Sequence, residues 1–120
     1  MNMELRSIAS KGDLAKERIT FRVRADLDVG DYAFMQTGFF DDEITTTVYN
    51  TFWFPYKPVA KGDLVVLYTR KGTPSSKPLR GQGHSHFFFM GLDRAIWNNL
   101  DKGAVLLEAA SWQGMGASQL

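Results

Sequence analysis

Hydrophobic and polar residues alternate along much of this chain, with the period of two that is typical of β-strands. Residues 18–25 show the pattern well, because Ile19, Phe21 and Val23 share one face and arginines occupy the other. A register shift of one residue would bury those arginines, so the pattern specifies which face meets the core. The segment is therefore predicted to be a half-buried strand of an antiparallel sheet.

Further segments are rich in β-branched and aromatic residues and are separated by turn signals. They cover residues 5–10, 32–40, 44–54, 64–69, 86–90 and 105–109. About seven short strands in one chain predict an all-β fold, namely a single immunoglobulin-like antiparallel β-sandwich. We expect this domain to span residues 1–112, and the glycine-containing end at 113–120 to be a flexible tail.

Residues 70–83 are predicted to form the longest irregular segment, because Pro74, Pro78 and several glycines interrupt any strand pattern. Long loops in compact domains are often functional. This loop contains basic residues and no acidic residue. The basic residues are Arg70, Lys71, Lys77 and Arg80. The loop is therefore a candidate binding surface.

The composition excludes several classes of function. The net charge of +1 creates no overall attraction to nucleic acid or anionic lipid, so such binding would need a local patch. The absence of cysteine excludes disulfides and thiolate metal sites. No run is long and apolar enough for a membrane helix, and the first ten residues do not resemble a signal peptide. We therefore expect a cytoplasmic protein.

Four features follow one another between residues 52 and 112. They are the aromatic-proline segment 52–55, a glycine-acid turn and buried strand at 61–67, the corner 96–99, and a final strand at 101–108. In order and spacing they resemble the lamin-tail domain, an immunoglobulin-like β-sandwich found in nuclear lamins and in many bacterial proteins. The resemblance implies a non-catalytic module for interaction or assembly, and it brings no catalytic residue with it.

The corner at Trp97 is predicted to be structural. Trp97 is large and flat, and its indole N–H needs a hydrogen-bond partner if it is buried. Asn98 and Asn99 tolerate the left-handed backbone of a tight corner. Gly62 and Gly103 permit turns that a Cβ atom would hinder. These residues are expected to shape the fold and not to bind a ligand.

The two histidines, His84 and His86, are alternate residues and would point to the same face of a strand. Both imidazoles could therefore bind one metal ion, with Asp93 or Asp101 as a third ligand. The simpler interpretation is that the two histidines flank a junction between a loop and a strand. We therefore expect no metal ion and no other cofactor.

Two short acidic segments, Asp26–Asp31 and Asp41–Glu43, are typical of solvated turns, which favour aspartate and glycine. If both lay at one end of the sandwich, they could instead hold calcium, for which carboxylate oxygens are suitable ligands. The sequence leaves calcium binding open.

Catalysis is poorly supported, because no set of acid, base and nucleophile can be assembled from the sequence. Ser75, Ser76 and Ser85 lie outside any nucleophile-elbow pattern. We therefore expect a non-enzymatic protein that binds a protein partner or forms a homo-oligomer.

The expected binding surface combines the basic loop with Tyr49 and Trp53, since the strand that contains them is largely apolar on both faces over residues 52–54. An alternative is a module that binds nucleic acid or anionic lipid through the 70–83 loop. A second basic row, Arg18, Arg22 and Arg24, would support that alternative if it lay on the same side. A small histidine-based metalloenzyme is a third interpretation.

Overall fold

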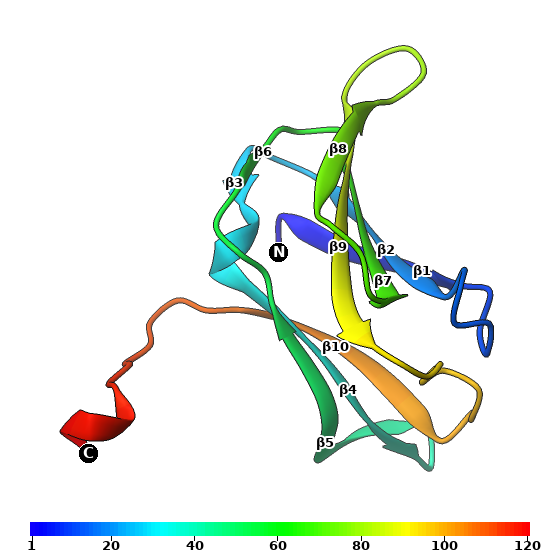
Figure 1. Cartoon of the computed structure of the whole chain (residues 1–120), viewed down its shortest axis with the longest axis vertical. Coiled ribbons are helices and arrows are strands. Elements are labelled where there is room, and N and C mark those ends of the chain that lie inside the picture. Colours follow the sequence, from blue (N-terminus) through cyan, green and yellow to red (C-terminus); the bar gives the residue numbers. More distant parts are fainter.

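The computed structural model describes residues 1–120, and nearly all of its regular structure is β (Figure 1). The strands are β1 (Met3–Ala9), β2 (Arg18–Val23), β3 (Leu27–Asp28), β4 (Tyr32–Phe40), β5 (Glu43–Trp53), β6 (Pro58–Val59), β7 (Leu64–Arg70), β8 (Ser75–Pro78), β9 (His84–Leu92) and β10 (Lys102–Glu108). Two short 3-10 helices, η1 (Val29–Asp31) and η2 (Ala117–Gln119), complete the chain. The prediction of an all-β fold is confirmed.

The strands form a β-sandwich of two main sheets (Figure 1). The larger sheet has the order β1-β2-β7-β9-β8, and the smaller has the order β10-β4-β5. Strands β3 and β6 pair as a ribbon at one end of the sandwich. Every pairing is antiparallel except that of β7 with β9, which is parallel. After β7 the chain forms β8 at the edge of the sheet, and β9 then lies between these two strands. Strand β9 is antiparallel to β8 and therefore parallel to β7.

The core lies between the two main sheets and contains the apolar residues of β2. Ile19, Phe21 and Val23 are at most 1% exposed, as their alternation predicts. Phe21 meets Phe34 of β4 edge-on, with the ring centroids 5.9 Å apart. Such an aromatic pair contributes about 1 kcal/mol beyond the burial of its area. The cross-sheet contact therefore helps to hold the two layers together.

Residues 70–83 are not one irregular loop, so that prediction is wrong. Strand β8 lies within them and pairs antiparallel with β9. Two prolines hid this strand in the sequence, but an edge strand tolerates proline because one side of it needs no ladder hydrogen bond. As a result, Arg70 lies beside Leu92 and Lys77 beside Ser85, towards opposite ends of β9.

The corner between β9 and β10 packs Trp97 into the core. Its ring is tilted against Phe34, with centroids 6.0 Å apart. The indole N–H, however, has no hydrogen-bond partner, contrary to expectation. Asn98 and Asn99 do not adopt positive φ either, so the left-handed backbone predicted for them is wrong. Backbone hydrogen bonds to Glu17 hold the corner instead.

The two glycines singled out in the sequence have different roles. Gly62 has φ +91° and forms the turn before β7, as predicted. Gly103 lies inside β10 and not in a turn. A Cβ atom there would lie 2.5 Å from Cδ1 of Ile44, so β10 packs closely against the hairpin of β4 and β5 at Gly103.

The C-terminal residues leave the body of the sandwich after β10 (Figure 1). Trp112 still contacts it, because its ring packs edge-on against Trp53 with centroids 5.0 Å apart. Residues 113–120 are exposed throughout. None of the chain's helical segments has the length and apolar character needed to cross a membrane.

Candidate functional site

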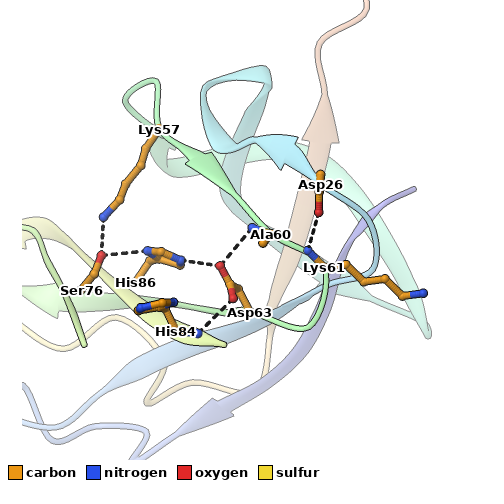
Figure 2. Close-up of polar contacts among 8 residues, drawn as sticks. All are labelled: Asp26, Lys57, Ala60, Lys61, Asp63, Ser76, His84 and His86. Atoms are coloured by element: carbon orange, nitrogen blue, oxygen red, sulfur yellow. Dashed lines mark hydrogen bonds and ion pairs between the residues drawn. The ribbon is translucent and has the colours of Figure 1, made fainter. Parts of the chain in front are cut away.

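A chain of hydrogen bonds links Asp63, His86, Ser76 and Lys57 (Figure 2). Nε2 of His86 lies 2.7 Å from Oδ2 of Asp63, and Nδ1 lies 2.8 Å from Oγ of Ser76. The ammonium of Lys57 donates to the same serine oxygen. In a neutral His86, the network therefore assigns the ring hydrogen to Nε2, and the Ser76 hydroxyl donates to Nδ1.

The turn before β7 aims the Asp63 carboxylate at this chain. The backbone N–H groups of Ala60 and His84 each donate to Asp63 at 3.0 Å (Figure 2). The parallel register places His86 beside Val65, near the start of β7. Because side chains alternate along a strand, His86 and His84 both face the side of β9 on which Asp63 lies.

The Asp63 carboxylate is buried and stays ionised despite its burial. Burial raises its pKa, but hydrogen bonds from Ala60, His86 and His84 and the charge interaction with His86 together outweigh burial. The pKa of Asp63 is therefore held below its ordinary value of 3.8. The carboxylate is available as a hydrogen-bond acceptor across the neutral pH range.

Serine, histidine and aspartate also form the nucleophilic set of many hydrolases. Here aspartate contacts Nε2 and serine contacts Nδ1, which is the reverse of that arrangement. The Ser76 oxygen also accepts from Lys57, which reduces its availability for attack. The geometry instead favours a structural link, since the chain joins the short edge strand β8 to β9 and to the turn before β7.

The predicted metal ligands do not come together as expected. The rings of His84 and His86 do lie on one face, with centroids 6.2 Å apart. However, the acid beside His86 is Asp63, and no group of three or more metal-ligating side chains is assembled. Neither Asp93 nor Asp101 therefore completes a site with the histidines, because the parallel pairing of β7 and β9 brings Asp63 there instead.

The two acidic segments lie at opposite ends of β4, because Asp26–Asp31 precedes that strand and Asp41–Glu43 follows it. They cannot form the paired calcium loops that the sequence left open. The first segment binds backbone, since Asp28 accepts from the N–H of Gly30 at 2.8 Å and Asp26 accepts from that of Lys61 at 2.9 Å. Its carboxylates therefore stabilise turns.

The predicted aromatic binding residues lie on β5, at the edge of the smaller sheet. Tyr49 is 52% exposed and Trp53 is 48% exposed. The indole N–H of Trp53 donates to the carbonyl of Gly30 at 2.8 Å, so this ring is fixed in place. These residues remain candidates for binding, on an edge that no other strand covers.

The predicted basic residues do not form one loop surface. Arg70 and Lys77 lie on strands of the larger sheet, whereas Lys71 and Arg80 lie in the segments on either side of β8. The second basic row partly joins them, because Arg18 pairs in register with Tyr68 and so lies close to Arg70. Arg18 and Arg70 come together because β2 and β7 are neighbours in the sheet, which the sequence alone does not predict.

Several residues at these sites were missed by the sequence reasoning. Lys57 and Ser76 carry no local signal of their role. Tyr68 was interpreted as an ordinary strand residue, and its stacking on Phe89 follows from the parallel pairing of β7 with β9. No protein-family model matches this chain, and the comparison with curated proteins likewise returns no match.

Proposed function

We propose that this protein is a non-catalytic assembly module that joins a second copy of itself through the free edge of β5. The observation that carries the proposal is the edge itself. Strand β5 has 11 residues and bonds only to β4, so its other side presents unpaired backbone groups. Such an edge is a template for another strand.

Most of β5 lacks the charges and prolines that usually protect a sheet edge, although its register with β4 is irregular on either side of Thr37. From Ile44 to Trp53 it contains no charged residue and no proline. Lysine, proline and inward-pointing charges are the common means of preventing edge-to-edge pairing. Large apolar side chains are exposed instead, including Ile44 at 48% and Val48 at 46%. The edge is therefore suited to pairing.

The outer face of the smaller sheet supports the same proposal. Trp53 of β5, Ala33 of β4 and Leu107 of β10 stand in one row across the three strands. The next row contains Met35 and Val105. Antiparallel pairing of two β5 strands around a twofold axis would join the two three-stranded sheets into one six-stranded sheet, with this outer face continuous across it. The same residues on both copies would then form the interface.

The resemblance of residues 52–112 to the lamin-tail domain is a second support, since that resemblance implies a module for interaction or assembly. A cytoplasmic location is compatible with a chain that contains no cysteine. A protein partner that adds its own strand to β5 would use the same physical mechanism as a second copy.

Sedimentation velocity of wild type and Val48→Lys tests the proposal. We expect a concentration-dependent dimer for wild type and at least tenfold weaker association for Val48→Lys, because lysine opposes pairing of the edge. The matched control is Leu120→Lys, which changes an exposed apolar residue in the C-terminal tail, away from β5. A wild type that stays monomeric up to several hundred micromolar would exclude self-association through β5.

A further inference from the structure

We propose that the outer face of the larger sheet binds single-stranded nucleic acid. Bases would stack on Tyr68, Phe87 and Phe89, and backbone phosphates would contact the basic residues among them. This site is on the opposite layer of the sandwich from β5, and the proposal does not depend on self-association.

The aromatic side chains form a compact platform on β7 and β9. Tyr68 and Phe89 are paired in register, and their rings stack with centroids 5.4 Å apart and planes 14° apart. Phe87 is the preceding outward-facing residue of β9, and its centroid lies 6.3 Å from that of Tyr68. All three residues are half-buried, so they are held by the sheet and still present surface to solvent.

Two arginines border this platform. The guanidinium of Arg70 lies 4.7 Å from the ring centroid of Tyr68 and 5.0 Å from that of Phe89. The guanidinium of Arg18, from β2, lies 6.0 Å from the ring of Tyr68. Guanidinium planes and aromatic rings are the two surfaces on which unpaired bases stack in proteins.

Charge on this sheet favours a polyanion. Lys77 extends the basic border, since its ammonium lies 5.4 Å from the ring centroid of Phe87. Among the strand residues of the larger sheet, Glu4 is the only acid, and it is already paired with Arg24 at 2.6 Å and with Arg6 at 3.2 Å. Phosphates contacting this face would therefore meet little repulsion.

The arrangement favours a single strand over a duplex or a membrane. Bases in a duplex are already stacked on one another, so flat rings on a sheet can receive them only from an unpaired strand. A membrane surface would favour apolar groups that project from the protein. Here the aromatic side chains are half-buried and lie beside cations, since Arg70 contacts Tyr68 and Phe89 and Lys77 contacts Phe87.

Fluorescence anisotropy with labelled 12-mer DNA and RNA oligonucleotides tests the proposal on the full chain. We expect wild type to bind both single strands at 50 mM salt. Phe87→Leu should weaken binding about tenfold while leaving its salt dependence unchanged, because it removes a stacking surface and no charge. Arg70→Gln should weaken binding and reduce the slope of log affinity against log salt by about 0.7.

Arg94→Gln is the matched control, because this side chain is 85% exposed and lies beyond the sheet in the corner after β9. Circular dichroism of each variant checks folding, and Lys77→Gln gives a further charge variant if Phe87→Leu is unstable. The proposal is overturned if neither single strand binds, if duplex or anionic vesicles bind more tightly, or if Arg94→Gln weakens binding as much as Arg70→Gln.

Discussion

The backbone N–H of Trp97 donates a hydrogen bond to Oε2 of Glu17, 3.2 Å away. The same buried carboxylate accepts from the N–H of Gly12 at 2.8 Å, from the N–H of Ile96 at 2.9 Å and from the hydroxyl of Thr69 at 2.7 Å. One side chain thus connects the loop before β2, the corner before β10 and the end of β7. This connection fixes the corner that positions Trp97 in the core.

Glu17→Gln should lower the free energy of unfolding by about 3 kcal/mol, because an amide nitrogen would face donors that now meet a carboxylate oxygen. Urea unfolding followed by tryptophan fluorescence measures the change. The control is Glu43→Gln at an exposed position, which should cost less than about 0.5 kcal/mol. Equal stability of the two variants would show that the buried carboxylate does not hold the corner.

The pH dependence of stability should reveal Asp63. Its folded-state pKa lies below the ordinary value of 3.8, so its contribution is fully present above that pH and is lost as the pH falls through the folded pKa. Wild type should therefore lose stability more steeply below about pH 4 than Asp63→Asn does. Urea unfolding at a series of pH values gives the slope of stability against pH for each protein. Equal slopes below about pH 4 would show that Asp63 does not have a lowered pKa in the folded state.

Asp63→Asn should also be less stable than wild type at pH 7, by about 1 to 3 kcal/mol, because Nε2 of His86 and two backbone N–H groups lose a charged acceptor. Asp26→Asn is a suitable control, since that carboxylate accepts a single exposed backbone hydrogen bond. If Asp26→Asn lowered the free energy of unfolding more than Asp63→Asn does, the proposed importance of the Asp63 hydrogen bonds would be refuted.

Ser76 should not behave as a nucleophile. Its oxygen accepts from Lys57 and its neighbour His86 is oriented for a structural link, so a fluorophosphonate probe is expected to leave the protein unlabelled. Mass spectrometry of the treated protein measures this, with Ser76→Ala as the comparison. Labelling of wild type that disappears in Ser76→Ala would contradict the non-catalytic interpretation.

A side chain at Gly103 should be accommodated only if its neighbours shift. A Cβ atom there would lie 2.5 Å from Cδ1 of Ile44, a side-chain methyl group that can rotate away, and 3.2 Å from the carbonyl oxygen of Gly38, which would have to shift slightly. We expect Gly103→Ala to cost about 1 kcal/mol in urea unfolding, the lower end of the usual range for overpacking, because the closest neighbour is a movable methyl group. A neutral effect would mean that the strands of the smaller sheet separate more readily than this packing indicates.

The sequence predicted the elements whose pattern is local. The alternation at Ile19, Phe21 and Val23 fixed both a strand and its buried face, because a register shift would have buried arginine. It could not predict β8, since Pro74 and Pro78 interrupt the pattern and the partner that stabilises the strand is distant in sequence. Local patterns identify strands but not their neighbours.

The candidate sites depend on neighbours, which explains why they were missed. Asp63 contacts His86 and Tyr68 contacts Phe89 only because β7 and β9 are parallel neighbours. The apolar sequences of these two strands do not show which strand lies beside which. Glu17 was overlooked for a different reason, since glutamate is rarely buried and its four donors come from three separate segments.

Hydrogen exchange at two protein concentrations tests self-association through β5 most directly. The account predicts that backbone amides of β5 exchange more slowly at high concentration than at low concentration, because a second β5 strand then covers the edge. Amides of β8, on the edge of the other sheet, should exchange equally in both samples. Concentration-independent exchange along the whole of β5 would contradict the account.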